Sequence, residues 1–458
     1  MNMTNNTTAN KIVNMLMNAG FKAFFVGGCV RDAFMGMVPH DVDITTNATP
    51  DNIHVVFPNH VDTGIKHGTV SVRVADDPEL FEVTTFRVDG KYNDGRHPDS
   101  VVFVTDIKDD LSRRDFTINA MAFNPISNEF VDPFNGRDDI ANKTVRAVGN
   151  AKDRFMEDPL RVLRAMRFAV KLGFTIDTDT AAAMHDVEVL NKLATCISKE
   201  RITDELRKML TCNKPVHDIF MAFSDVIDTL FPDMVAMHAP HNSRWHKHDI
   251  FEHSVCVIDS CDTNRFDIKL AAMFHDIGKP ASRTIDENDP SINHFKGHPK
   301  KSVDICKVAF DRDLRLPTKE KNKVLDLILH HDDHINPTDR GIRKFIVNCS
   351  EDTVRAWIIL KGADIADHIF PADKVDTFND MLTRFDLFKA NIDNVVANMS
   401  ALKISDLAIN GRDVMDMFNI KSGPMVGKVL STAFDAVVNG TITNDRDVLI
   451  DFVKNMDI

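Results

Sequence analysis

The hydrophobic pattern of the chain changes once, near residue 150, and this change constrains the fold more than any other feature. Before it, short apolar runs such as Phe24–Val26 end in glycine, and Ile44, Val70 and Val72 alternate with polar residues. Such short and alternating runs are typical of strands, and residues 101–104 (VVFV) predict another buried one. The first part of the chain is therefore expected to mix helices with a sheet.

Beyond residue 150, apolar residues recur at the spacing of a helix. The stripe Leu160, Leu163, Met166 and Ala169 ends before Gly173, a good helix stop. A second stripe covers residues 202–210, with Ser198 as its N-cap, and amphipathic helices continue to the end of the chain. We therefore predict an α+β protein, with a mixed head followed by an all-helical body.

Composition excludes several classes of protein. A chain of 458 residues with 43% hydrophobic and 27% charged residues is globular, and its length predicts two to four domains. No apolar run reaches the roughly 18 residues of a membrane helix. Seven cysteines without a CxxC pair indicate reduced, mostly buried thiols in a cytoplasmic protein. The net charge of −13 argues against unspecific nucleic-acid binding but permits local basic faces.

Two aspartates follow a glycine turn in the head. Gly27 and Gly28 end the first strand, and Asp41 and Asp43 come shortly afterwards. In a strand, residues two apart share a face, so these carboxylates would repel unless a divalent cation such as magnesium lies between them. The glycines would let the backbone approach phosphate at a helix N-terminus, with Arg31 adding a charged contact.

Glu82 is a candidate third carboxylate on a neighbouring strand. Taken alone, a DxD pair is more often a solvated strand edge, and a single glutamate is more often an exposed strand residue. The combination of the glycine turn and the aspartate pair at this short distance is what favours a nucleotide site.

Six motifs in order carry a family resemblance over about residues 24–210: GGCVRD, DVD, FEVTTFR, RRDFTINAMAFNP, DPFNGRDDI and EDPLRVLRAMRF. They resemble the class II nucleotidyltransferases, which include the CCA-adding tRNA nucleotidyltransferases and the bacterial poly(A) polymerases. The resemblance implies a polymerase-β-like head in which Asp41 and Asp43 bind two magnesium ions. An RNA 3′-hydroxyl would then attack the α-phosphate of a nucleoside triphosphate, releasing pyrophosphate.

Basic residues in the later motifs are candidate nucleotide ligands. Arg114 and Asn119 could bind triphosphate and sugar hydroxyls, or alternatively form a helix surface with local salt bridges. Asp158 is a candidate N-cap, with Pro159 at the first helical position. The basic residues of the helix that follows predict one ridge opposite the leucine stripe, which could also be a solvated face: Arg161, Arg164, Arg167 and Lys171.

By resemblance, Asp158 and Arg161 act as a protein template that hydrogen-bonds the base edge of CTP or ATP, with Arg164 and Arg167 nearby. Both bases carry an exocyclic amine that an aspartate can accept from. The resemblance also implies a hinge at residues 132–139 and a mobile loop at residues 89–99 that gates the site.

A second set of motifs lies in the helical body, where eleven of the nineteen histidines fall between residues 238 and 334. FEHS, FHDIGK and HFKGH resemble the HD phosphohydrolase superfamily. This resemblance implies that His253, His275 and Asp276 bind Ni, Mn, Co or Zn. Imidazole and carboxylate groups are donors that suit these metals. Asp364 is the preferred fourth ligand. The alternatives are Asp367 and Asp332, and His298 fits a secondary role.

The sequence as a whole predicts an enzyme that adds CCA to tRNA from CTP and ATP. The HD domain would add 2′,3′-cyclic phosphodiesterase and phosphatase activity. One alternative is a poly(A) polymerase or an enzyme that adds only CC or only A; a second is an HD hydrolase or RNA-binding protein with an inactive head. The oligomeric state stays open. The expected domains are the head (1–145), a helical neck that selects the nucleotide (146–225), the HD domain (226–385) and a helical tail (386–458).

Overall fold

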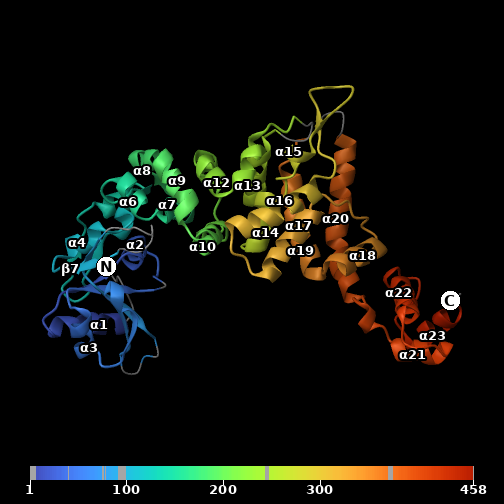
Figure 1. Cartoon of the computed structure of the whole chain (residues 1–458), viewed down its shortest axis with the longest axis horizontal. Helices are drawn as coiled ribbons and strands as arrows, with labels where there is room; N and C mark the ends of the chain where they lie inside the picture. Colours follow the sequence, from blue (N-terminus) through green and yellow to red (C-terminus); the bar gives the residue numbers. More distant parts are fainter. Residues whose placement is uncertain are drawn as a thin grey trace. The chain divides into compact units, whose positions relative to one another are not determined.

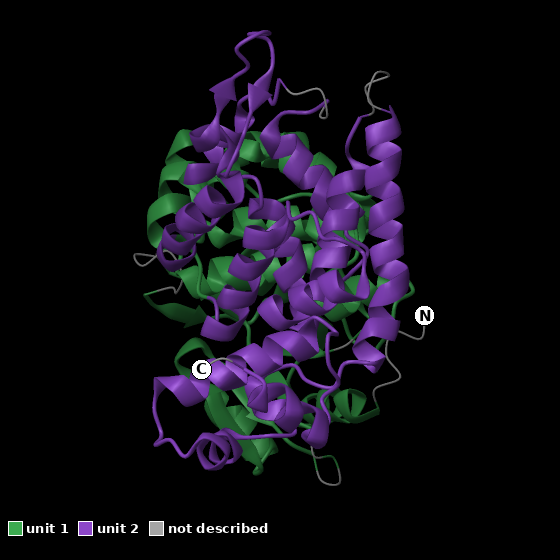
Figure 2. Cartoon of the chain, turned by 90° about the vertical axis from the view of Figure 1, so that its right-hand side faces the viewer, with its two compact units in different colours: residues 1–232, 313–315 green, residues 233–312, 316–458 purple. Residues whose placement is uncertain are grey.

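The computed structural model describes residues 7–39, 41–74, 77, 79–90, 99–242, 247–369 and 375–456. The chain forms two compact units, which Figure 2 shows in two colours: residues 1–232 with 313–315, and residues 233–312 with 316–458. The chain therefore crosses from one unit to the other three times. The helices and strands of both units are labelled in Figure 1.

The head of the first unit is built on a mixed sheet of seven described strands. β2 and β5 run parallel and every other neighbouring pair is antiparallel. In spatial order the strands are β3 His60–Gly64, β4 Thr69–Val72, β5 Phe81–Thr85, β2 Asp43–Thr46, β1 Ala23–Val26, β8 Ala122–Phe123 and β9 Phe130–Val131.

Both faces of the sheet are covered, which explains why β1 is apolar at every position. Phe25 packs into a core with Ile12 of α1 and Ile53 of α3. Phe24 and Val26 point the other way, into a second core of the head. The described head helices are α1 Thr7–Asn18, α2 Gly28–Phe34, α3 Pro50–Val56, α4 Ile107–Ser112 and α5 Gly136–Ala141, with 3₁₀ turns η1 Ile65–His67 and η2 Thr117–Asn119.

The prediction of a buried strand at residues 101–104 was wrong about burial. β7 Val101–Phe103 pairs only with β6 Arg87–Asp89 in a two-stranded ribbon. Val102 is 63% exposed and Phe103 41% exposed. A run of apolar residues does not say how many strands or helices cover it, and this ribbon lies outside the main sheet.

The neck consists of short helices after the head. α7 is buried at ten of its positions and ends at Gly173, whose φ of 67° is the left-handed C-cap that the sequence predicts. Asp158 lies one residue before the assigned N-cap, Pro159, and its carboxylate accepts the Leu160 N–H at 3.1 Å. The neck elements are β10 Thr144–Val145, α6 Ala151–Glu157, α7 Leu160–Leu172, β11 Thr175–Ile176, α8 Thr178–Met184, α9 Val187–Cys196, α10 Lys199–Leu210, α11 His217–Ala222 and α12 Ser224–Leu230.

The second unit is helical apart from one small hairpin. All nine residues of α14 are buried, Asp267 and Lys269 included, because α13, α17 and α19 pack against this helix. The described elements are η3 Pro232–His238, α13 Ile250–Ser260, α14 Phe266–Phe274, α15 Lys279–Ser282, β12 Thr284–Ile285, β13 Asn293–His294, α16 His298–Asp313, α17 Thr318–His330, α18 Asp339–Cys349, α19 Glu351–Ala366, α20 Val375–Ala397, η5 Ile404–Asp406, α21 Gly411–Phe418, α22 Pro424–Val438 and α23 Arg446–Lys454.

The structure confirms the α+β class, with the main sheet in the head and helices elsewhere. Among the described residues, no helix combines the length and the apolar character needed to cross a membrane. All seven cysteines are free thiols. Only Cys29, Cys261 and Cys306 are buried, so the expectation of mostly buried thiols was too broad.

Candidate active sites

The glycine turn of the head brings a carboxylate and a guanidinium together. Gly27 follows β1 with a φ of 79°, in the region that L residues rarely adopt. A Cβ on Gly27 would lie 2.9 Å from Nη1 of Arg114 and 3.8 Å from Oδ2 of Asp43. The site therefore needs glycine both for the backbone angle and for the space, and Gly28 begins α2 directly afterwards.

The two aspartates are exposed and lie close enough to interact. The sequence predicted that both aspartates lie in one strand. In the structure β2 begins at Asp43, and Asp41 lies in the bend before it. Desolvation by the surrounding protein raises the pKa of Asp43; the Arg114 guanidinium opposes this and the Asp41 charge adds to it. The pKa of Asp43 therefore lies above the ordinary aspartate value, chiefly because of desolvation and to a smaller degree because of the neighbouring Asp41 charge.

Glu82 lies beside Asp43 on the neighbouring strand. The parallel register pairs Ile44 with Val83, so one step earlier Asp43 stands opposite Glu82. Ile44 and Val83 are buried while Asp43 and Glu82 are exposed, which puts the two carboxylates on the same face. Exposed oxygens of this kind are the ligands that magnesium prefers, so the residues present fit that ion.

Five of the predicted head and neck residues belong to two groups. In the first, Nη1 of Arg31 donates to Oδ1 of Asn119 at 2.6 Å, although the two residues are 88 positions apart. Asn119 donates in turn to Asp115 at 3.2 Å, and Arg164 holds Asp115 with two hydrogen bonds of 2.8 and 2.5 Å. Asp115 links these residues; it stands within the RRDFTIN motif but was not among the predicted site residues.

Arg114 forms the second group with Asp43. Its Nη2 lies 3.7 Å from Oδ2 of the buried Asp110, while its Nε is buried and has no hydrogen-bond partner among the described residues. Burial lowers the pKa of Arg114, and Asp110 is the largest of the opposing influences. A buried, unmatched N–H beside an exposed carboxylate is a donor that suits an anionic ligand.

The neck arginines do not form an exposed ridge, contrary to one reading of the sequence. Arg161 and Arg167 are each 8% exposed. Arg161 bonds Oε2 of Glu157 at 2.6 Å, and Nε of Arg167 bonds Oε2 of Glu205 at 2.5 Å. An ion pair lets a guanidinium be buried, and an i, i+3 spacing cannot reveal such partners. Lys171 alone of the predicted ridge is exposed.

Asp158 is also held by a neighbour. Its two carboxylate oxygens accept hydrogen bonds from Arg201 at 2.6 and 3.2 Å. Arg201 comes from α10, 43 residues further along the chain, and was not singled out in the sequence. Both expected template residues, Asp158 and Arg161, therefore have protein partners in this structure.

The expected hinge is a capped turn, and the expected loop is only partly described. The carboxylate of Asp132 accepts the N–H groups of Gly136 at 2.7 Å and Arg137 at 3.0 Å. A Cβ on Gly136 would lie 2.3 Å from the Thr117 carbonyl oxygen, so the turn requires glycine. Within the predicted loop at 89–99, residues 91–98 lie outside the described residues.

The second unit brings all four predicted ligands into one buried cluster. His253 lies on α13, His275 and Asp276 follow α14, and Asp364 lies on α19. Nε2 of His253 is 3.3 Å from Oδ1 of Asp364 and 3.5 Å from Oδ2 of Asp276, and Nε2 of His275 is 3.2 Å from Oδ2 of Asp276. His253, His275 and Asp364 together form a buried donor group of the size that holds one metal ion.

The remaining polar atoms of this cluster also suit a metal. Nδ1 of His275 lies 2.8 Å from the Ala272 carbonyl, which accepts its hydrogen and leaves Nε2 as the lone-pair nitrogen. Nε2 of His275 and both oxygens of Asp276 are buried, and what surrounds the Asp276 oxygens is the ammonium of Lys279 and the ring nitrogens of neighbouring histidines. Buried polar atoms rarely stay unsatisfied, so a cation at this place fits the donor set.

Asp367 and Asp332, the alternative fourth ligands, have different positions. Asp367 accepts a hydrogen bond from Nδ1 of His253 at 2.8 Å, so it orients that ring from behind. The side chain of Asp332 is 51% exposed and lies outside the buried donor groups. Of the three aspartates, Asp364 is the one that faces Nε2 of His253.

Several residues of the cluster were missed in the sequence. Nε2 of His331 lies 3.0 Å from Nε2 of His298, and both are near Oδ1 of Asp276. Nζ of Lys279 is 2.6 Å from Oδ2 of Asp276, and also 3.1 Å from Nε2 of His241. Although burial alone would favour the neutral acid, the protonated form of His275 and the ammonium of Lys279 hold the pKa of Asp276 well below its usual value. The run HHDDH at 330–334 was the only signal for His331.

Comparison with known proteins gives matches along almost the whole chain. Four family descriptions match in order: "Poly A polymerase head domain" at residues 23–146, "Probable RNA and SrmB- binding site of polymerase A" at 173–237, "HD domain" at 237–369 and "tRNA nucleotidyltransferase domain 2 putative" at 368–453. The CCA-adding enzyme of Leuconostoc mesenteroides is 32% identical over 446 residues, which are 97% of this chain and 95% of that protein.

The chain belongs to the family of CCA-adding enzymes. The family member from Oceanobacillus iheyensis is 48% identical over 201 residues, 44% of this chain and 49% of its own length. Among solved structures, the CCA-adding enzyme of Bacillus stearothermophilus in complex with CTP has a TM-score of 0.69 and 27% identity, covering 97% of this chain and 95% of that one. The family is one of tRNA nucleotidyltransferases, and its nucleotidyltransferase and HD domains imply dependence on divalent metal ions.

Proposed function

We propose that this chain adds C, C and A in turn to the 3′ end of tRNA in the cytoplasm, taking CTP and ATP without a nucleic-acid template. The placement of Asp43 and Glu82 on adjacent parallel strands, beside Gly27 and Arg114, carries the proposal. It is supported by the 32% identity to a CCA-adding enzyme over 97% of the chain. The related solved structures include complexes with CTP, with ATP and with tRNA.

In the head, Asp41, Asp43 and Glu82 would hold magnesium. When bound, that ion neutralises phosphate charge and favours the ionised form of a hydroxyl. Gly27 leaves room for phosphate oxygens, and Arg114 donates to them through its unmatched Nε–H. The 3′-oxygen of the RNA forms a bond to the α-phosphorus, the bond to the β-phosphate oxygen breaks, and pyrophosphate leaves with that electron pair.

Arg31, Asn119 and the neck residues would fix the sugar and the base. Arg31 donates a hydrogen bond to Asn119, which holds both side chains in place for the sugar. Asp158 and Arg161 would pair with the base edge of cytosine and then of adenine. Because they are bonded to Arg201 and Glu157, recognition requires these side chains to exchange their protein partners for the base. Arg164 and Arg167 position this end of α7 through Asp115 and Glu205.

For the second unit, we propose a metal-dependent 2′,3′-cyclic phosphodiesterase and phosphatase. The buried donor group of His253, His275 and Asp364, with the Asp276 carboxylate beside Nε2 of His275, favours it. A nickel, manganese, cobalt or zinc ion held by His253, His275, Asp276 and Asp364 would polarise the phosphoester and lower the pKa of water. A water oxygen bonds to phosphorus, the bond from phosphorus to one ribose oxygen breaks, and the water proton ends on that oxygen as a hydroxyl.

Two alternatives are distinguished by the product. A poly(A) polymerase would extend RNA with ATP alone and would not stop, and a CC-only or A-only enzyme would leave a shorter product. An inactive head with a working hydrolase would give no extension at all. The decisive assay is incubation of tRNA lacking its 3′ end with CTP, with ATP, and with both, followed by sizing at one-nucleotide resolution.

Addition of two nucleotides with CTP alone, and of three with both substrates, is the expected result. Growth beyond three would identify a poly(A) polymerase. A product that stops at two with both substrates would identify a CC-adding enzyme. An Asp43→Asn variant is the control for contaminating activity, since it should extend none of the substrates.

A further inference from the structure

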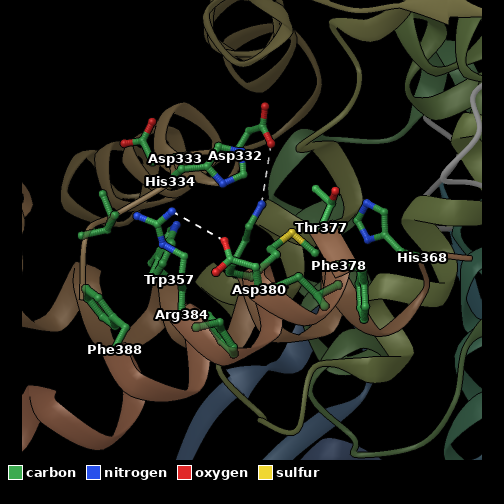
Figure 3. Close-up of a pocket in the computed structure, with 15 residues that line it drawn as sticks. Asp332, Asp333, His334, Trp357, His368, Thr377, Phe378, Asp380, Arg384 and Phe388 are labelled. Carbon is green, nitrogen blue, oxygen red and sulfur yellow. Dashed lines mark ion pairs between the residues drawn. The ribbon is translucent and has the colours of Figure 1, made fainter. Parts of the chain in front are cut away.

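A cavity of about 450 Å³ lies beside the HD cluster, and none of the proposed metal ligands lines it. It opens between α19 and the first half of α20, as the close-up in Figure 3 shows. One side is aromatic and the mouth is charged. The aromatic lining consists of Trp357, Phe378, Phe385 and Phe388, and the charged lining consists chiefly of Asp332, Asp333, Lys361, Asp380 and Arg384.

A separate cleft lies over the HD cluster, and the cavity adjoins this cleft. Asp332 and His368 line both, while Asp276 and Asp364 line the cleft only. Lys361 stands at the junction: its Nζ lies 3.6 Å from Oδ1 of Asp332, an ion pair drawn in Figure 3, and 3.5 Å from Oδ2 of Asp364. A molecule with a phosphate at the metal cluster can therefore extend past Lys361 into the aromatic cavity.

The aromatic wall is rigid. Nε1–H of Trp357 donates to the His330 carbonyl at 2.9 Å, which fixes the indole. The indole packs edge-on against Phe388, with ring centroids 5.1 Å apart, and against Phe385 at 6.1 Å. Fixed aromatic faces are the surface on which nucleobases stack, and every base has such a face.

We propose that this cavity binds the nucleobase of a nucleoside 2′,3′-cyclic phosphate whose phosphate is hydrolysed at the HD cluster. The inference rests on the proposed hydrolase and gives that site its substrate class, a nucleoside phosphate ester. The volume lies in the range of small-molecule sites, which are mostly apolar with a few charged groups at defined places. Asp332 and Asp333 at the mouth are acceptors for base amines, and Lys361 supplies a positive charge on the phosphate side.

Binding can be measured separately from hydrolysis because Trp357 lines the cavity. The chain has two tryptophans, so a Trp245→Phe background leaves Trp357 as the only one. Its fluorescence is followed during titration with adenosine 3′-monophosphate, with adenosine 2′,3′-cyclic phosphate, and with methyl riboside 2′,3′-cyclic phosphate, which has no base. A short RNA ending in a 2′,3′-cyclic phosphate distinguishes a polynucleotide end from a free mononucleotide.

A matched pair of variants on α20 tests the location. Thr377→Phe puts a phenyl group at a residue that lines the cavity. Thr383→Phe makes the same change at an exposed residue of the same helix that does not line it. We expect saturable quenching by the two adenosine ligands and none by the base-free ester. Thr377→Phe should weaken binding about tenfold, the scale of losing one stacked base, and Thr383→Phe should leave it unchanged.

The outcomes separate the two claims. Hydrolysis of adenosine 2′,3′-cyclic phosphate without any change in Trp357 fluorescence, and with equal KM for the base-free ester, would overturn the base cavity while the hydrolase stands. Saturable, base-dependent quenching without hydrolysis would support the cavity and refute the hydrolase. Equal weakening by Thr377→Phe and Thr383→Phe would show that α20 acts through folding and would overturn the assignment.

Discussion

The two candidate sites solve the problem of concentrated negative charge in opposite ways. In the head, Asp41, Asp43 and Glu82 are exposed oxygens around a turn. In the second unit, Asp276 and Asp364 are 1% and 6% exposed. A site that accepts both a tRNA end and a triphosphate has to stay open, and water and incoming cations screen its charge. A buried site has to balance its charge from within, which is why lysines stand beside both aspartates.

This difference has a consequence for mutagenesis. Removing an exposed carboxylate from the head takes away chemistry but little packing. Removing a buried ligand from the second unit also disturbs a network of histidines, lysines and aspartates. The comparison therefore predicts clean separation of function for head variants, whereas variants of the buried cluster need a separate check of folding.

The largest effect is expected from Asp43→Asn. Nucleotide incorporation into tRNA should fall by about 10³-fold or more, equivalent to about 4 kcal/mol, because an anionic metal ligand becomes neutral. Hydrolysis of adenosine 2′,3′-cyclic phosphate should be unchanged. Radiolabelled CMP incorporation measures the first effect. Glu129→Gln removes an exposed acid near β9 and is the control. Incorporation at more than a tenth of the wild-type rate would refute the assignment.

The reciprocal change is His275→Ala. It should reduce cyclic phosphodiester hydrolysis by at least about 100-fold and lower the content of tightly bound transition metal, while CMP incorporation is retained. Elemental analysis and circular dichroism of the same sample show whether metal, fold or both are lost. His217→Ala changes a histidine of the first unit and is the control, which should lower neither hydrolysis nor metal content. Full hydrolysis by a folded His275→Ala protein would contradict the metal site.

A smaller effect is expected from Arg201→Ala. Because Arg201 clamps both oxygens of Asp158, its loss should relax the choice between CTP and ATP at the third position by about tenfold, as should Asp158→Ala and Arg161→Ala. The ratio of kcat/KM for the two nucleotides is the measurement. Lys208→Ala, an exposed change on the same helix, is the control. Selection that stays within twofold of wild type in all three variants would end the template hypothesis.

The smallest effect concerns stability. The Asp115→Asn protein should lose about 2 kcal/mol at pH 7; the loss is below that of a fully buried pair because the side chain of Arg164 is 34% exposed. Although burial opposes ionisation, Arg164 lowers the pKa of Asp115 below its ordinary value. Its stabilisation is therefore complete above the unfolded pKa near 4 and is lost as the pH falls through the folded one.

Thermal unfolding from pH 6 to pH 3 checks this sign. The difference between wild type and Asp115→Asn should shrink on acidification. A difference that stays constant or grows would show that Asp115 is not ionised in the folded protein.

The positions of Asp43 and Glu82 could be predicted because strand parity and motif order fix them, whereas Asp41 lies in the bend before the strand. Asp43 and Glu82 needed only two short strands and a parallel pairing, and His253 and His275 came from the resemblance of their motifs to the HD superfamily. Bonds between distant segments could not be predicted. Arg31 and Asn119 were each predicted as site residues, yet nothing in the 87 residues between them indicates that they touch.

The burial of individual side chains could not be predicted from the sequence either. Arg167 can be buried only because Glu205 reaches it from another helix, and a step of three residues says nothing about that partner. The same holds for Val102, whose apolar neighbours predict a core strand although its ribbon has one partner strand only. His331 falls in a run of polar residues whose spacing to His298 follows no local rule.

Because the chain crosses three times between the units, truncation and limited proteolysis do not separate them simply. Residues 313–315 return to the first unit, where the Arg315 N–H donates to Thr203 of α10 at 2.8 Å. A gene truncated after codon 232 would thus encode a fragment lacking part of its own unit. A single proteolytic nick between residues 233 and 312 would leave both pieces tied to the first unit, so limited digestion can appear silent by gel filtration while the chain is already cut.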